Sequence, residues 1–283
     1  MNPEDAMLPW PARLGWRGLD KYLALAALSF RQRLDERATL VGSVLFYALI
    51  LLIYSRLWGA LLVRPDASAL GDSALGQSPG KYVWYMAVTE WIMLAQPRIY
   101  LEIESDVRSG DVAYQLSRPL SYVGAKIAAA LGEIGVRWLL LAASGLAYAR
   151  LFSGEWPSGD GLLLAMLAGV LASLVMMLAH VAIGLSAFWL HDCMPVYLIW
   201  QKLSFVLGGL MLPLGIYPAW LRAVAELTPF SALLYGPGQL VVQPDPAAAL
   251  RLLLTLLAWG GVGLGGVLLL EQRARRNLCL HGG

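Results

Sequence analysis

The chain has 283 residues, of which 58% are hydrophobic and only 14% are charged. Soluble domains carry about 25% charged residues, so this composition, with a mean hydropathy of +0.61, excludes an ordinary soluble protein. It predicts an integral, all-α membrane protein. The formal net charge of +2 is close to neutral, so no nucleic-acid partner is expected, and only the distribution of charge along the chain is informative.

Residues 1–38 are predicted to lie in the cytoplasm and to contain an amphipathic helix. Apolar residues recur there at helical spacing, at Trp16, Leu19, Leu23, Ala26, Phe30 and Leu34. The apolar run is too short to span a bilayer, so the helix is expected to lie in the headgroup region. It acts there either as a plain anchor or as a part that transmits motion. No signal peptide is expected, since no short apolar core precedes a small-residue cleavage site.

Six later segments are apolar enough to cross a bilayer, which takes about 20 mostly apolar residues. They are Thr39–Val63, Tyr82–Leu101, Ser121–Phe152, Gly161–Leu190, Met194–Ile216 and Ala247–Leu270. The third and the fourth exceed the length that a bilayer requires, so we expect them to tilt or to project beyond it. The sequence thus predicts a six-span transmembrane domain over residues 39–272.

Charged residues interrupt the apolar sequence between the predicted second and third spans, over residues 102–120. They are Glu102, Glu104, Asp106, Arg108, Asp111 and Arg118. Such a cluster is too costly in hydrocarbon, so it must lie in water. Gly110 suits a helix C-terminus, Asp111 can cap a following turn, Pro119 stops it, and Ser121 caps the third span. The pattern predicts two short helices in a tight elbow; the alternative is a solvated turn that merely joins two spans.

Four ionisable residues fall inside the predicted spans. Glu133 and Arg137 are four residues apart on one helix face and can neutralise each other, so we predict a structural ion pair. Glu90 has no local partner. It is predicted either to line a translocation path, with Gln201 and Lys202 of the fifth span as candidate neighbours, or to be paired inside the bundle. Lys202 can also extend to the membrane surface.

Prolines and glycines divide the apolar region after the fifth span into pieces too short to cross, so residues 217–243 are predicted to form short external helices. These helices either pack against the mouth of the bundle or dip into the membrane and return. Trp220, Leu221, Val224 and Leu227 form one apolar helix face. Irregular backbone at membrane depth must be covered by protein or face water.

The positive residues set the expected orientation. Arginine and lysine concentrate in the N-terminal segment, around the 102–120 connector and in the tail 273–283, whereas the opposite side carries few. Both termini and the connector are therefore expected in the cytoplasm, with the chain in the inner (plasma) membrane. Cys193 and Cys279 fall on this side, so no disulfide is expected.

Two motifs resemble the ABC type-2 exporter permeases. The segment Ile103 to Leu120, I-E-S-D-V-R-S-G-D-V-A-Y-Q-L-S-R-P-L, is similar to the cytoplasmic connector of that family, in which R-S-G and a later (K/R)-P follow an acidic stretch. The segment Phe188 to Tyr235, with F-W-L-H-D-C-M-P-V-Y-L-I-W-Q-K-L and T-P-F-S-A-L-L-Y-G-P, resembles its fifth span and external helices. The resemblance covers nearly the whole chain and points to the daunorubicin-exporter-like branch.

The resemblance implies a permease subunit of an ATP-dependent exporter. In such transporters two permeases, identical or related, pair with two cytoplasmic ATPase subunits. The charged connector would then dock onto the ATPase through the six residues named above. ATP and Mg²⁺ would bind in the partner, with no cofactor in this chain, and membrane lipids would surround the spans.

Enzymatic functions find little support in the sequence, so we expect no enzyme. Residues 76–82 approach a phosphate-binding loop but lack one residue between the glycines and the hydroxyl residue after the lysine. Ser144 and His180 lie in spans that an intramembrane serine protease would use, but residues 142–143 lack the expected glycine. No metal-ligand spacing is present. An ion-coupled secondary carrier remains the alternative transport function, although no internal repeat of the kind seen in such carriers is found.

Overall fold

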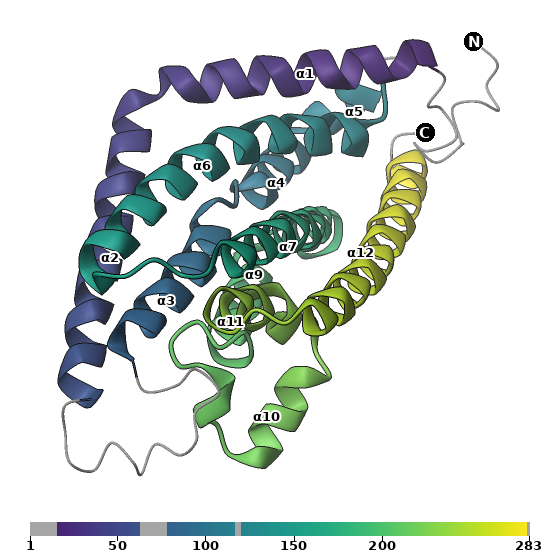
Figure 1. Cartoon of the computed structure of the whole chain (residues 1–283). Coiled ribbons are helices and arrows are strands. Elements are labelled where there is room, and N and C mark those ends of the chain that lie inside the picture. Colours follow the sequence, from purple (N-terminus) through teal and green to yellow (C-terminus); the bar gives the residue numbers. More distant parts are fainter. Residues whose placement is uncertain (1–15, 63–77, 117–119, 282–283) are drawn as a thin grey trace.

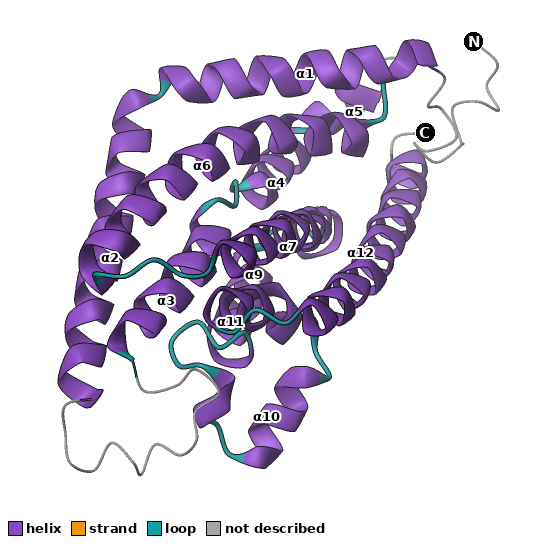
Figure 2. Cartoon of the chain, viewed as in Figure 1, coloured by secondary structure: helices purple, strands orange, loops and turns teal. Residues whose placement is uncertain are grey.

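The computed structural model describes residues 16–62, 78–116 and 120–281, with side chains at 19–60, 78–115 and 120–276. Every regular element in these ranges is helical, as Figure 2 shows. The predicted all-α class is therefore confirmed for the described part of the chain.

The described chain contains α-helices, one 3₁₀ helix and one π-helix. In chain order they are α1 (Trp16–Asp35), α2 (Arg37–Leu62), α3 (Pro79–Leu94), α4 (Ile99–Ser109), α5 (Asp111–Leu116), α6 (Tyr122–Ser153), α7 (Gly159–Leu185), α8 (Ala187–Leu190), α9 (Met194–Leu207), the 3₁₀ helix η4 (Leu214–Ile216), α10 (Ala219–Glu226), the π-helix η5 (Ser231–Tyr235), α11 (Gly236–Val242) and α12 (Pro246–His281).

Figure 1 shows α1 lying across one end of the molecule and α2 running from it along one side. α1 packs along α6, and α12 packs along α7. α3 lies in the middle, in contact with α2, α6 and α11. Its residues Tyr82 to Ile92 are buried without interruption, and Tyr82 stacks on Trp58 of α2 with ring centroids 4.1 Å apart. The main core therefore forms around α3.

A glycine allows α1 to approach α6 closely. A Cβ atom at Gly132 of α6 would overlap the backbone carbonyl of Ala26 in α1. Three residues further, a Cβ at Gly135 would meet the Phe30 ring at 3.4 Å, which is ordinary van der Waals contact. The predicted amphipathic helix is present, and its inner face packs on a neighbouring helix. Leu19, Leu23 and Leu34 of the predicted apolar face remain exposed.

Four helical segments of the described chain are long and apolar enough to cross a membrane. They are Arg37–Ala60, Tyr122–Ser153, Gly159–Leu190 and Pro246–Arg276. The predicted second and fifth spans correspond to α3, with 16 residues, and α9, with 14. At 1.5 Å per residue these helices reach only about 24 and about 21 Å. A multi-pass membrane fold follows, whereas the count of six spans stays a prediction.

Two predicted spans are not continuous helices. The helix predicted over 82–101 ends at Leu94, and a new helix, α4, begins at Ile99. Pro97 lies in the break, where it has no N–H to continue the helix. The helix predicted over 194–216 ends at Leu207, and Gly209 follows with φ of +70°, a conformation that favours glycine.

The predicted short helices in 217–243 are present, but the second half of that segment is buried. η5 and α11 pack against α3 and α7, and Leu233, Leu234 and Leu240 are nearly inaccessible to solvent. A Cβ at Gly238 would lie 2.7 Å from the Tyr85 ring, so glycine permits this close packing. The predicted tail 273–283 continues α12 as helix to His281.

Candidate functional site

The charged connector forms a two-helix elbow, defined here as α4, Gly110 and α5. Gly110 adopts φ of +80° at the C-terminus of α4, which lets the chain turn directly into α5. The predicted pair of short helices is therefore present, although it begins at Ile99 rather than at residue 102. Arg118, the last predicted coupling residue, lies outside the described residues.

One face of α4 is buried against the transmembrane bundle. Ile99, Tyr100 and Ile103 are almost fully buried, and α4 packs against α7. A Cβ atom at Gly184 of α7 would lie 2.9 Å from the Ile103 Cβ and 3.0 Å from the Tyr100 Cα. The connector is thus not wholly in water, because its first helix is seated on α7.

Glu104 connects the elbow to the start of α9. Its carboxylate accepts hydrogen bonds from the Cys193 backbone N–H at 3.1 Å and from the Cys193 Sγ at 2.8 Å. It also pairs with Arg108 at 3.0 Å. The hydrogen bond from Cys193 holds the pKa of Glu104 below its ordinary value, although burial opposes this. Burial, and then the Glu104 carboxylate, raise the pKa of Cys193 to about 12, so a neutral thiol donates to a charged acid.

An aromatic cluster lies beside this contact. The Tyr100 ring of α4 stacks on Tyr197 of α9 with centroids 4.0 Å apart. The His180 ring of α7 meets both tyrosines edge-on, at 5.9 and 5.6 Å. Tyr100, His180 and Tyr197 therefore bring α4, α7 and α9 together at one point.

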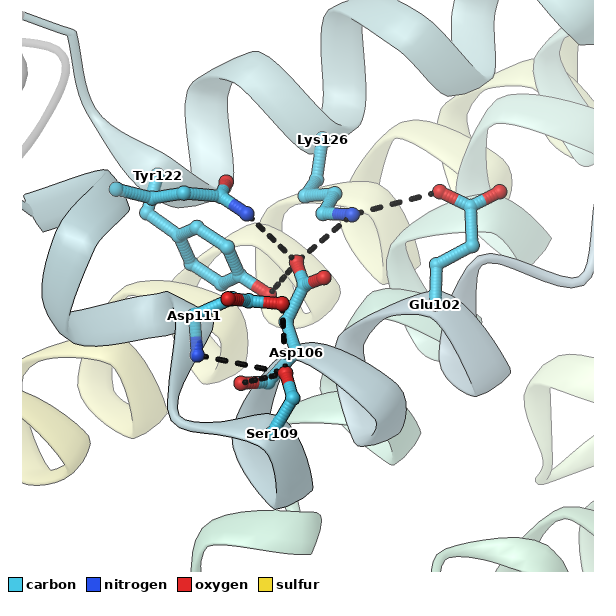
Figure 3. A network of polar contacts seen from close by, with 7 residues as sticks. Glu102, Asp106, Ser109, Asp111, Tyr122 and Lys126 are labelled. Carbon is cyan, nitrogen blue, oxygen red and sulfur yellow. Dashed lines mark hydrogen bonds and ion pairs between the residues drawn. The ribbon is translucent and has the colours of Figure 1, made fainter.

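Asp106 braces the elbow internally, as Figure 3 shows. Its carboxylate accepts hydrogen bonds from the Tyr122 hydroxyl at 2.9 Å and from the Gln115 side-chain amide at 3.2 Å. It also forms an ion pair with Lys126 at 2.9 Å, and Lys126 reaches Glu102 at 3.5 Å. The start of α6 is thereby fixed to α4, and α5 is fixed to α4 through the same carboxylate.

Ser121, just before α6, joins three parts of the chain. Its side-chain oxygen accepts from the Gly124 N–H and so caps α6. Its hydroxyl reaches Glu271 of α12 at 3.2 Å, and its backbone N–H donates to the Tyr22 hydroxyl of α1 at 3.1 Å. The exit of the elbow is therefore held by both α1 and α12.

The predicted coupling residues divide into inner and outer ones. Glu104 and Asp106 are engaged inside the fold. The side chains of Arg108 and Glu102 are 64% and 53% exposed, and Asp111 is exposed next to Ser109, with which it shares a 2.7 Å hydrogen bond. Tyr114 of α5, which no sequence motif singles out, is 66% exposed. The outer surface of the elbow is thus a small charged and aromatic patch.

The ionisable residues of the predicted spans have different neighbours. Glu133 pairs with Arg137 at 2.7 Å and also with Arg33 of α1, and Arg137 donates to the Gln96 carbonyl at the α3–α4 break, at 3.3 Å. Glu90 is buried.

The fifth-span candidates do not pair with Glu90 in the described chain. Among the described residues no ion pair joins Glu90 to Lys202. No hydrogen bond joins Gln201 to Glu90 within the described ranges, and the Gln201 amide donates to the Tyr197 hydroxyl at 3.4 Å. Lys202 is exposed and lies over the Phe205 ring at 5.4 Å.

Ser144 and His180, the residues considered for a serine protease, make structural contacts instead. The Ser144 hydroxyl donates to the Leu140 carbonyl at 2.9 Å within its own helix, while His180 lies in the aromatic cluster, so the two form no dyad. Within the described chain, no three His, Cys, Asp or Glu side chains are grouped to hold a metal ion.

The fold and this elbow define a helical, multi-pass membrane protein with a short helical connector seated on the bundle. A family model described as "ABC-2 family transporter protein" matches residues 80–260, from the start of α3 into α12 and including the elbow. The match covers well over half of the chain, which therefore belongs to the ABC-2 transporter family. Comparisons with curated proteins and with solved structures gave no match.

The family predicted from the connector and from the fifth-span motif is confirmed, while the assignment to a branch stays a prediction. Sequence reasoning missed Cys193, the Tyr100–His180–Tyr197 cluster and Arg33. Cys193 and Tyr197 lie inside a quoted motif, but nothing in their spacing indicates contacts with residues some ninety positions away.

Proposed function

We propose that the chain is the membrane-spanning permease subunit of an ATP-dependent exporter and that the elbow docks onto a cytoplasmic ATPase subunit. One observation carries this proposal: the elbow has an inner face seated on α7 and α9 and an outer patch formed by Arg108, Asp111 and Tyr114. A connector that only joined two spans would need no such inner contacts. ATP and Mg²⁺ bind in the ATPase, and a second permease, identical or related, completes the transporter.

Movement of the ATPase reaches the membrane helices through α4. A displacement of α4 presses on α7 where Gly184 meets Ile103, and it pulls on α9 through the Glu104–Cys193 hydrogen bonds. The Asp106 brace moves the first turn of α6 in the same step. Packed contacts of this kind switch between discrete arrangements, which is how a small displacement can change access to a pathway.

The exposed position of Lys202 is an argument for a second permease or a water-filled pathway next to α9. It lies at the centre of the exposed face of α9, among Leu198, Ile199 and Val206, which are exposed as well. A lysine in the middle of a face turned to hydrocarbon is costly. We therefore infer that this face meets water or another permease rather than lipid.

Glu90 is proposed to lie along the translocation path, because a buried acid without an ion-pair partner in the described chain is rarely retained for packing alone. Glu90→Gln should lower the substrate-dependent part of ATP hydrolysis by the purified complex while leaving its subunit composition unchanged. Unaltered hydrolysis in that variant would assign Glu90 a structural role inside the bundle.

Substitutions in the outer patch test whether the elbow docks onto the ATPase subunit. Arg108→Glu combined with Tyr114→Ala should reduce recovery of the ATP-binding-cassette subunit with the tagged permease by about tenfold or more, since two exposed contact residues are lost. The measurement is quantitative mass spectrometry of the complex purified in mild detergent, together with its rate of ATP hydrolysis.

Arg222→Glu is the matched control. Arg222, like Arg108, is an exposed arginine paired with a glutamate four residues away, but it lies in α10. The control should recover as much ATPase as the wild-type chain. Equal recovery with the elbow variant, or the absence of any ATPase from the wild-type complex, would contradict the proposal.

A further inference from the structure

The short helix α10 has three distinct faces. Leu221 and Ala225 point into the bundle, where they contact the main core. Arg222 and Glu226 form an exposed ion pair at 2.8 Å on one flank. The remaining face carries Trp220, Val224 and Leu227, which are 70%, 45% and 81% exposed. The sequence places Leu221 with this apolar face, whereas in the fold Leu221 turns inward and the other three turn outward.

The position of α10 matches a membrane surface. In Figure 1, α1 lies at one end of α2, and α10 lies level with the opposite end. α2 has 26 residues, which gives it a length of about 39 Å. That length is close to the thickness of a bilayer with its headgroup regions, about 40–45 Å. α10 thus lies where the surface opposite to α1 is expected.

The chemistry of the outward face fits lipid better than a second copy of the chain. A stable dimer interface takes about 800 Å² from each partner, and three side chains provide far less. A tryptophan beside aliphatic residues, with charges kept on a separate flank, is the pattern of a helix that lies in the interfacial region. The Arg222–Glu226 pair is already neutralised and can remain in water.

We propose that α10 is an interfacial helix whose Trp220–Val224–Leu227 face inserts into the lipid leaflet on the side of the membrane opposite to α1. The partner of this surface is the headgroup–acyl boundary of that leaflet. The Arg222–Glu226 flank faces the aqueous phase, and Leu221 and Ala225 hold the helix on the bundle.

Fluorescence quenching in lipid nanodiscs tests this placement. An environment-sensitive maleimide dye is attached at Val224→Cys, and separately at Glu226→Cys, in a full-length chain that carries Cys279→Ser; Cys193 is buried. Lipids with a nitroxide just below the headgroup should quench the dye at position 224 at least about twofold more than the dye at 226. Aqueous iodide should show the reverse order. Leu227→Cys, at the other end of the same face, should behave as position 224.

Two results would overturn the proposal. Equal and strong iodide quenching at positions 224, 227 and 226 would show that the whole helix lies in water. Protection of positions 224 and 227 from both the nitroxide lipid and iodide would show that protein covers this face, as a second permease would.

Discussion

At the scale of single residues, Glu104 is a charged side chain of the elbow that lies buried rather than in water. It is a charged acid with little exposure that accepts two hydrogen bonds from Cys193. Removing a partner that satisfies a buried donor costs more than removing an exposed one. The contact is therefore expected to contribute to stability as well as to the connection between α4 and α9.

Glu104→Ala should lower the free energy of unfolding by about 1–3 kcal/mol, because the Cys193 N–H loses its acceptor. Arg108→Ala removes the exposed partner of the same acid and should cost less than about 1 kcal/mol. Unfolding of the detergent-solubilised chain, followed by circular dichroism, measures both. A smaller loss for Glu104→Ala than for Arg108→Ala would contradict this assignment.

The Glu104 carboxylate should also make the free energy of unfolding depend on pH. The pKa of Glu104 is lowered in the folded chain, so its contribution is fully present above the ordinary value of 4.5 and is lost as the pH falls through the folded-state pKa. The stability difference between the wild-type chain and Glu104→Gln should be constant from pH 7 to pH 5 and should shrink below that range. A stability difference between the two chains that grows as the pH falls would contradict this prediction.

At the scale of helices, the sequence predicts most elements and misses their interruptions. The amphipathic α1, the Gly110 turn and the Ser121 cap follow from local signals and are present. The break at Pro97 is not predicted, because Pro97 lies in an apolar run and average hydropathy does not detect a missing backbone N–H. The helix break near Gly209 likewise depends on a backbone conformation, φ of +70°, that average hydropathy does not detect.

The glycines of α6 give a matched test of helix packing. Gly132→Ala should displace α1, since its Cβ would overlap the Ala26 carbonyl, whereas Gly135→Ala adds an ordinary contact with Phe30. Overpacking of this kind costs about 1–3 kcal/mol. Hydrogen exchange of residues 19–35 should rise in the first variant only. Equal protection in both variants would mean that α1 does not depend on this contact.

At the scale of the whole molecule, the number of spans decides on which side the elbow lies. If α3 and α9 cross together with the four longer segments, reporter fusions at the N-terminus, near Ser109 and at the C-terminus all report cytoplasm, and fusions near Ser73 and Pro157 report the outside. If only the four longer segments cross, the fusions near Ser109 and Pro157 exchange sides. Reporter activity at these two positions thus separates the two topologies, and an external Ser109 would rule out docking of the elbow on a cytoplasmic ATPase.

The candidate site could be located from the sequence, but its internal structure could not. Charge density alone predicts that Glu102 to Asp111 lie outside hydrocarbon. Whether a given acid faces outward or inward depends on contacts with distant helices, such as Cys193 for Glu104 and Lys126 for Asp106. For this reason the internal contacts of Asp106 could not be predicted from the sequence, while its role in docking stays a prediction.

The contacts of Ser121 have a consequence for biosynthesis. Tyr22 is made early, whereas Glu271, the acid that receives the Ser121 hydroxyl, is made only when most of α12 has been translated. The exit of the elbow at Ser121 is therefore held by α1 alone until α12 inserts, and only then by both helices. The support of the proposed docking surface is thus completed late in synthesis, and a chain stalled before α12 would lack the Ser121–Glu271 contact at the exit of its elbow.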